Sequence, residues 1–278
     1  MDLVIESLYR LRIDEFIDVH NKAFANYLVP VPALNELQMS RVFSSQRVDQ
    51  GKSLVAFEDG KPIGFANVAV RGWSLRIASV GVIPEYRRQG VARRLLEKII
   101  SDAKNQNYRT IELEVFPLNE RAVKLYASLG FEVVRKIYAF KALPTISKVS
   151  ADQGITEIDP FEAGKIIDSY DDLSLPWVCS GWTLSSWGPR MQAFVSEHAV
   201  AWVCIVDETR AILFCLAVRP SFRNQGHGTK MVEYLFSNFS TQAWEITRYA
   251  PEESKRFFEK CGFIAEEPHQ QQMRLKLR

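Results

Sequence analysis

Residues 86–94 read YRRQGVARR, and residues 222–230 read FRNQGHGTK. Both stretches follow the pattern R-x-x-G-x-A/G, which begins at Arg87 in the first and at Arg223 in the second. Each is preceded by an apolar segment that ends in proline and is followed by an amphipathic pattern typical of a helix. The two arginines are 223 − 87 = 136 positions apart, so we infer that the chain contains two copies of one strand–turn–helix unit.

The turn in this unit is suited to bind a phosphate group. A strand that ends at Pro84 and turns into a helix near Gly90 leaves backbone N–H groups unpaired, and the helix dipole favours an anion there. The small residues let a phosphate approach the backbone, and the arginines add positive charge. Neither copy matches a P-loop or a dinucleotide-binding motif. The residues expected at this site are Arg87, Arg88, Gln89, Gly90, Val91, Ala92 and Arg93 in the first copy and Arg223, Gln225, Gly226 and Gly228 in the second.

The remaining pattern predicts a mixed α/β (α+β) protein with two domains. The polar stretch 142–154 contains proline and glycine and is typical of a linker, which divides the chain into residues 1–145 and 146–278. The second domain repeats the order of the first, but its beginning is shorter and rich in tryptophan. In the first domain the periodicity predicts strand 3–9, helices 13–27 and 33–43, a hairpin that turns at Asp59 and Gly60, strand 75–83, helix 90–104, strand 110–116, helix 119–130 and a strand after it.

The composition is that of a soluble globular protein. Of the 278 residues, 47% are hydrophobic and 24% are charged, and the net charge of +2 is too small to suggest a nucleic-acid partner. No apolar run approaches the roughly 18 residues of a membrane span, and MDLVIESLYR lacks the basic start of a signal peptide, so we expect a cytoplasmic protein without a membrane partner. The four cysteines and four histidines form no metal-binding pattern, which predicts free thiols and no metal.

A second motif follows the first in the N-terminal copy, N-x-x-A-x-x-L-Y-x-x-x-G-F from Asn119 to Phe131. Together the two motifs resemble the GNAT superfamily of acetyltransferases, strongly over about 60–145 and moderately over 190–265. The resemblance implies two tandem domains, each with a mixed, twisted sheet that splays open beside the strand of the first motif. It also implies acetyl-CoA in that opening, with the pyrophosphate on the N–H groups of about 88–93, the pantetheine arm along Val80 and Val82, and Asn119 close to the cofactor.

Acetyl transfer to an amine needs a base for the amine, a donor for the developing oxyanion and a proton for the leaving thiolate. In the branch of the family that acetylates protein N-terminal amines, the resemblance assigns these proton transfers to Glu114 as base and Tyr126 as acid. Two plainer interpretations stay open. Glu114 could be an exposed strand residue with a salt-bridge partner, and Tyr126 could be a packed aromatic residue. Asn119 is expected to cap the following helix in either case.

The second copy lacks this proton-transfer set. At the offset of the second motif, 263 − 131 = 132, the positions of Glu114, Asn119 and Tyr126 hold Ile246, Pro251 and Phe258. We therefore expect the second copy not to catalyse, and either to bind a CoA-type ligand or to form a wall of the substrate cleft. Its tryptophans could line an acceptor site or belong to a core between the domains: Trp177, Trp182 and Trp187.

The leading hypothesis is an acetyl-CoA-dependent N-acetyltransferase that uses the first copy and acts on a primary amine of a small molecule or a protein. The alternatives are a non-catalytic module that binds or senses acyl-CoA, and a scaffold in which both copies are inactive. The amine itself is not specified by any motif in the sequence.

Overall fold

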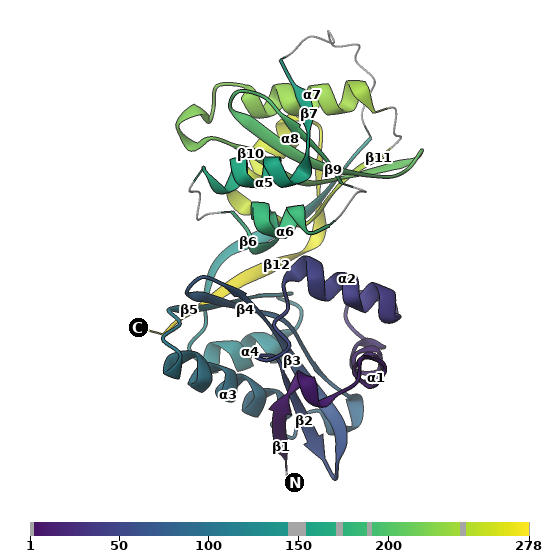
Figure 1. The fold of residues 1–278 in the computed structure, drawn as a ribbon, viewed down its shortest axis with the longest axis vertical. Helices are drawn as coiled ribbons and strands as arrows, with labels where there is room; N and C mark the ends of the chain where they lie inside the picture. The colour runs from purple at the N-terminus through teal and green to yellow at the C-terminus, as the bar shows by residue number, and fades with distance from the viewer. Residues whose placement is uncertain (1–2, 144–153, 171–174, 188–190, 240–242, 278) are drawn as a thin grey trace. The chain divides into compact units, whose positions relative to one another are not determined.

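The computed structural model describes residues 3–143, 154–170, 175–187, 191–239 and 243–277. Most of the linker expected at 142–154 lies outside these residues. The chain forms two compact units (Figure 1). The N-terminal unit contains Met1–Arg135 and Gln271–Arg278, and the C-terminal unit contains Lys136–Gln270.

The N-terminal unit is built on a mixed sheet. Its strand order is β1-β2-β3-β4-β5-β12, and β4 and β5 run parallel whereas the other neighbours are antiparallel. This mixed sheet with flanking helices confirms the predicted fold class. The strands are β1 (Val4–Ser7), β2 (Leu54–Glu58), β3 (Lys61–Arg71), β4 (Ser74–Val82), β5 (Thr110–Val115) and, from Gln271 onward, β12 (Ile264–Lys276).

Helices cover both faces of this sheet (Figure 1). Helices α1 (Ile13–Phe24) and α2 (Glu36–Gln46) pack on one face, where Phe16 and Phe43 meet Phe65 of β3. Helices α3 (Val91–Asn105) and α4 (Glu120–Ser128) pack on the other face through the larger core cluster of the unit. The amphipathic patterns of the sequence thus place one pair of helices on each side.

The C-terminal unit repeats this architecture. Its strand order is β6-β11-β10-β9-β8-β7, in which β10 and β11 run parallel. The strands are β6 (Glu132–Ala142), β7 (Thr156–Ile158), β8 (Met191–Val195), β9 (Ala199–Asp207), β10 (Arg210–Val218) and β11 (Ala243–Pro251), and the helices are α5 (Pro160–Asp168), α6 (Gly181–Ser185), α7 (His227–Asn238) and α8 (Lys255–Lys260). The short α5 and α6 pack closely at Gly164 and Gly181, where a Cβ on Gly181 would lie only 2.0 Å from the Gly164 carbonyl oxygen.

Two strands complete sheets that their positions in the sequence do not suggest. Residues 137–142 of β6 follow α4 directly, yet they pair with β11 of the C-terminal unit. Residues 271–276 of β12 lie at the end of the chain, yet they pair with β5 of the N-terminal unit. The compact units therefore differ in their bounds from the ranges 1–145 and 146–278, and the division of the chain by function stays a prediction.

Within the described ranges, no helix is both long and apolar enough to cross a membrane. All four cysteines are free thiols; Cys179 and Cys215 are buried, whereas Cys204 and Cys261 are half-buried.

Candidate active site

The sheet of the N-terminal unit opens between β4 and β5. Their parallel pairing reaches Ile77 and Leu113 and then stops, although β4 continues to Val82 and β5 to Val115. A β-bulge at Ala78 interrupts the register of β4 with β3 at the same level. Because a bulge bends its strand and raises the local twist, β4 turns away from β5 here. This gap is the splay that the sequence resemblance implied.

The backbone of β4 lines the gap. Directly after the last residue of β4, Ile83 donates its N–H to the carbonyl of Ile63 on β3. Because hydrogen-bonded and non-hydrogen-bonded positions alternate in an antiparallel pair, Val80 and Val82 direct their backbone groups away from β3 and toward the gap. The carbonyl of Val82 accepts a hydrogen bond from Arg87 Nε at 3.1 Å. The N–H and C=O of Val80 are thus directed at a position where a pantetheine amide could pair.

A row of unpaired N–H groups stands at the end of the gap. Arg88 and Gly90 both have positive φ, 65° and 81°, and no side chain caps the start of α3. Among the hydrogen bonds of the described residues, none is donated by the six consecutive backbone N–H groups from Arg88 to Arg93. Such a row, added to the helix dipole, forms a concave anion site. A Cβ on Gly90 would meet nothing within 4 Å, so the space in front of the turn is open.

The side chains of the motif have unequal roles. Arg87 donates to the carbonyls of Val82 and Ala23, at 3.1 and 2.9 Å, and so ties the turn to the end of α1. Arg93 is held by Ser128 Oγ at 2.7 Å and by Glu97. Gln89 closes the turn by donating to the Glu85 carbonyl. Arg88 is exposed, and its charge is available to an anion in front of the turn.

Glu114 is the first residue of β5 beyond the last pair with β4. Its Oε2 lies 2.8 Å from Arg76 Nε and 2.7 Å from Arg76 Nη2, and the two side chains are only 8% and 4% exposed. The interpretation of Glu114 as an exposed residue is therefore wrong, whereas the salt-bridge partner is present. Oε1 accepts no hydrogen bond from the residues that the structure describes.

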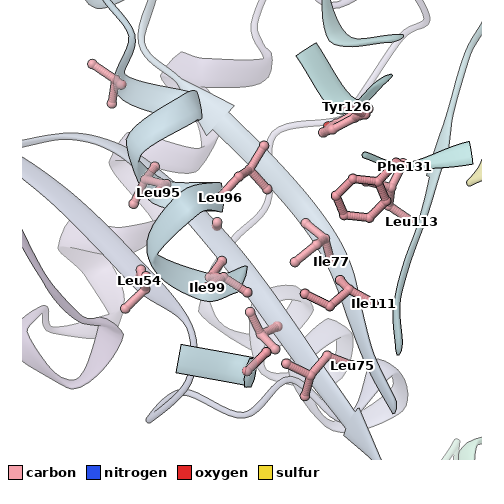
Figure 2. Close-up of a cluster of buried hydrophobic side chains, with 14 of the residues drawn as sticks. Leu54, Leu75, Ile77, Leu95, Leu96, Ile99, Ile111, Leu113, Tyr126 and Phe131 are labelled. Carbon is pink, nitrogen blue, oxygen red and sulfur yellow. The ribbon is translucent and has the colours of Figure 1, made fainter. Parts of the chain in front are cut away.

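Tyr126 lies in the core cluster on the opposite face of the sheet. Its ring packs edge-to-face on Phe131 at 5.9 Å, beside Leu113 and Ile77 (Figure 2). Burial raises the pKa of Tyr126, and nearby Tyr27 raises it further, so the hydroxyl is a hydrogen-bond donor throughout the neutral range. Tyr126 is thus a packed aromatic residue, and this packing is compatible with a role as an acid.

Asn119 caps α4. Its side chain accepts a hydrogen bond from Ala122 N at 3.3 Å, as expected for the residue that begins this helix. The cap fixes the start of α4, the helix that carries Tyr126.

The sequence analysis did not identify the residues that contact Glu114 and its neighbour Glu112. Arg76 stands in the otherwise apolar strand LRIASVGV, and a cation there signals a buried partner. Arg76 Nη1 also donates to Gln46 Oε1, at the end of α2. From β12, Gln272 and Arg274 both donate to Glu112, the other buried carboxylate of β5. No pattern in the sequence brings β12 to this position.

The second copy repeats the gap and the turn. Pairing of β10 with β11 stops at Leu213 and Ile246, a bulge follows at Phe214, and Gly226 has a φ of 88°. The six N–H groups of residues 224–229 donate no hydrogen bond to the described residues either. Gly228, however, is buried against the Phe257 ring, where a Cβ would come within 3.0 Å, so packing alone accounts for a glycine there.

The sheet register corrects one correspondence. Because Ile77 pairs with Leu113 and its counterpart Leu213 pairs with Ile246, the residue equivalent to Glu114 is Thr247 rather than Ile246. The offset between the copies is 133 on this strand and 132 on the following helix, so one residue is missing from the intervening loop of the second copy. Thr247 still offers a hydroxyl in place of a carboxylate.

Aromatic residues occupy the bulge of the second copy. Phe214 stands where the first copy has Ala78, and the Trp187 ring lies 4.8 Å from it. Trp177 is buried, whereas Trp182 and Trp187 are exposed. Among the described residues, no group of three His, Cys, Asp or Glu side chains is placed to hold a metal.

Comparisons with known proteins agree with this fold. Residues 5–131 match the model of the acetyltransferase (GNAT) family, and residues 190–265 match that of an acetyltransferase (GNAT) domain. Over 100 residues the chain is 32% identical to the ribosomal protein bS18-alanine N-acetyltransferase of Escherichia coli K12, a match that covers 35% of this chain and 68% of that enzyme.

Two solved structures share the fold over nearly the whole chain. A GCN5-related N-acetyltransferase from Sphaerobacter thermophilus superposes with a TM-score of 0.67 at 13% identity and covers 99% of this chain and 96% of its own. A tandem GNAT protein from the clavulanic acid biosynthesis pathway gives a TM-score of 0.60 at 12% identity and covers 100% and 99%. At these identities the likeness concerns the fold alone.

Proposed function

The chain belongs to the GNAT acetyltransferase family and contains two copies of its domain, and on this basis we propose that the N-terminal copy is an N-acetyltransferase that moves an acetyl group from acetyl-CoA to a primary amine. The observation that carries the proposal is the position of Glu114. It is the first residue beyond the paired part of β4 and β5, where the sheet opens. The second copy has the same opening but lacks the carboxylate and the tyrosine.

The cofactor would bind along the gap. We place the pyrophosphate on the N–H groups of residues 88–93 and the pantetheine arm along the backbone of Val80 and Val82, where the Val82 carbonyl already accepts a hydrogen bond from Arg87. The N–H of Val80 faces the gap and could also donate to the oxyanion that forms on the thioester carbonyl. The openness of the turn at Gly90 supports this placement.

In the proposed reaction the amine nitrogen attacks the thioester carbonyl carbon, a C–N bond forms, the C–S bond breaks, and CoA leaves as the thiol. Glu114 first takes a proton from the ammonium group of the acceptor, directly or through one water, on the oxygen that Arg76 does not hold. The neutral amine then attacks, and its nitrogen releases a second proton to solvent as the amide forms. Tyr126 gives its proton to the leaving sulfur and regains one from solvent. Burial raises the pKa of Tyr126, so the hydroxyl carries its proton when the sulfur departs, and the same shift makes it a weaker acid that depends on the basicity of the leaving thiolate.

The acceptor would approach from the face of the sheet that α1 and α2 cover. Arg76, which holds Glu114, also donates a hydrogen bond to Gln46 at the end of α2 and so marks this face. The match to a ribosomal protein N-terminal alanine acetyltransferase makes a peptide α-amine the first acceptor to test. For the second copy we propose a non-catalytic role, since Phe214, Thr247 and Phe258 replace the small, acidic and hydroxyl side chains of the first.

The test is release of CoA thiol from acetyl-CoA in the presence of an amine panel: a peptide with a free N-terminal alanine, the same peptide blocked at its N-terminus but carrying a lysine, and a polyamine. Amine-dependent thiol release, with mass spectrometry of the acetylated product, is the expected result. Calorimetric binding of CoA without turnover on any amine would instead support the alternative, a non-catalytic acyl-CoA-binding or sensing module.

A further inference from the structure

The ion pair between Arg76 and Glu114 is almost completely shielded from water. Both Nε and Nη2 of Arg76 reach the same oxygen, Glu114 Oε2, at 2.8 and 2.7 Å. A guanidinium is a planar fork, so two contacts to one oxygen fix the direction of the carboxylate as well as its charge. Oε1 is left as the oxygen that accepts no hydrogen bond from the described residues.

Stability is a weak reason for such a pair. Taking both charges out of water costs about as much as their attraction returns, and apolar residues of similar volume are often as stable. A buried pair beside a candidate reaction centre is better explained by what it positions. Here it positions the carboxylate of Glu114, the first residue of β5 beyond its pairing with β4, where the gap begins.

The same arginine reaches a helix. Arg76 Nη1 donates to Gln46 Oε1 at 3.0 Å, and Gln46 is the last residue of α2. Arg47 then ends the helix in a left-handed conformation, with a φ of 55°. Helix α2 is held on the sheet by Met39 and Phe43, which are buried beside α1. A guanidinium that contacts both Gln46 and Glu114 links this helix to the candidate base.

We propose that Arg76 is a positioning residue of the acetyl-transfer site, which orients the Glu114 carboxylate for proton transfer and couples it to helix α2 through Gln46. The inference rests on the proposed function of Glu114 as the base. It adds a specificity element, because an acceptor amine that packs against α2 is then aligned with Oε1 by the same contact.

The other charged groups near Glu114 are already paired. Glu112, on the same strand, forms an ion pair with Arg274 of β12 at 2.7 Å. Gln272 donates a hydrogen bond to Glu112 and accepts one from Arg135. From α1 the buried titratable side chain is His20, packed among phenylalanine rings, and burial lowers the pKa of His20. Arg76 is therefore the partner whose loss should disturb the orientation of the Glu114 carboxylate most.

The experiment measures kcat and KM, for acetyl-CoA and for the acceptor peptide, in wild type, Arg76→Lys, Arg76→Met and Gln46→Met. Arg76→Lys keeps the charge but loses the fork, and we expect kcat to fall about 10- to 100-fold, the size of effect that misplacement by about 1 Å produces. Gln46→Met removes one hydrogen bond that the guanidinium donates to a neutral amide, and kcat should fall about two- to tenfold. The KM for acetyl-CoA should change less than about twofold in both.

The split between kcat and KM separates positioning from plain structural support. Arg76→Met removes both the fork and the charge, so kcat should fall further than in Arg76→Lys, again with little change in the KM for acetyl-CoA. Arg12→Lys, on an exposed arginine paired with Asp14, is the matched control and should leave kcat and KM unchanged. If Arg76→Met is too unstable to assay, the fall of kcat in Arg76→Lys and Gln46→Met decides.

Two failures can be told apart. Wild-type protein that binds CoA but acetylates no amine would overturn the proposed function and this inference with it. Active wild type, with wild-type kcat in Arg76→Lys, in Gln46→Met and in any foldable Arg76→Met, would overturn the positioning role alone. Lower unfolding midpoints in those variants would then show that the pair serves stability.

Discussion

Gln272 lies directly opposite Glu114 in the sheet of the N-terminal unit. Its side chain accepts a hydrogen bond from Arg135 Nε at 2.8 Å and donates one to Glu112. The last strand of the chain thus covers the side of β5 that would otherwise be a sheet edge, and it does so beside the candidate base. The sheet of the N-terminal copy is therefore completed by residues that come after the C-terminal copy in the sequence.

We predict that Arg274→Gln destabilises the N-terminal unit by about 1–3 kcal/mol, because the buried Glu112 carboxyl would lose the hydrogen bonds of the half-exposed guanidinium. The midpoint of urea unfolding, followed by circular dichroism, measures the loss. Arg10→Gln, which breaks an exposed pair with Glu6, is the control and should change stability by less than about 1 kcal/mol. Equal midpoints for the two variants would show that β12 contributes little through this pair.

We predict that Gly90→Glu abolishes binding of acetyl-CoA by the N-terminal copy. The new side chain would stand in the open space before the N–H row and add a negative charge where the pyrophosphate belongs. Gly90→Ala is the matched control, since it introduces the same backbone strain, about 1 kcal/mol at a positive φ, without charge or length. Calorimetry with CoA should show near-normal affinity for the alanine variant and none for the glutamate variant. Equal affinities would remove the turn from the cofactor site.

The parts of this structure that local sequence determines could be predicted. The turn after β4 depends on Gly90 and on the proline before it, and the start of α4 depends on the cap at Asn119. Both are short-range relations between neighbouring residues, so the motif and its two copies were visible in the sequence. The opening of the sheet followed from the resemblance that these motifs carry.

Long-range pairing could not be predicted in the same way. The alternating patterns of β6 and β12 would suit any sheet edge equally. No local pattern indicates that β6 pairs with β11 or that β12 pairs with β5. The partner of Glu114 depends on the register between β4 and β5, which also decides that Thr247 and not Ile246 is its counterpart. A one-residue shift in a loop is enough to move a strand residue to the other face.

We predict that Tyr126→Phe lowers kcat by about 10²- to 10⁴-fold, the usual contribution of a general acid, with little change in the KM for acetyl-CoA. The ring and its packing on Phe131 are kept, so the loss concerns the hydroxyl alone. Steady-state kinetics with the accepted amine measure both constants. Wild-type turnover in this variant would exclude Tyr126 as the acid and leave it a core residue.

The same tyrosine predicts a pH dependence of stability. Because burial raises the pKa of Tyr126 in the folded protein, its contribution is complete below about pH 10, where an unfolded tyrosine is still protonated. Above that pH the unfolded state loses its proton first, and stability falls. Tyr126→Phe should therefore lose less stability than wild type between pH 10 and 11.5, measured by thermal unfolding. Tyr9→Phe, at an exposed tyrosine, should follow wild type. Identical slopes for wild type and Tyr126→Phe would contradict the burial of an un-ionised hydroxyl.

The last prediction separates the two copies. Glu114→Gln keeps the size of the side chain and an oxygen for Arg76 but removes the carboxylate, so kcat should fall by about 10²- to 10⁴-fold at neutral pH. Gly226→Glu blocks the equivalent turn of the second copy, whose N–H row is open in the same way, and should leave kcat nearly intact. Titration with CoA completes the comparison: a lower binding stoichiometry in Gly226→Glu than in wild type would identify a second, silent CoA site, and an equal stoichiometry would show that the second turn holds none. Loss of turnover in Gly226→Glu together with normal turnover in Glu114→Gln would mean that the catalytic and silent copies are assigned the wrong way round.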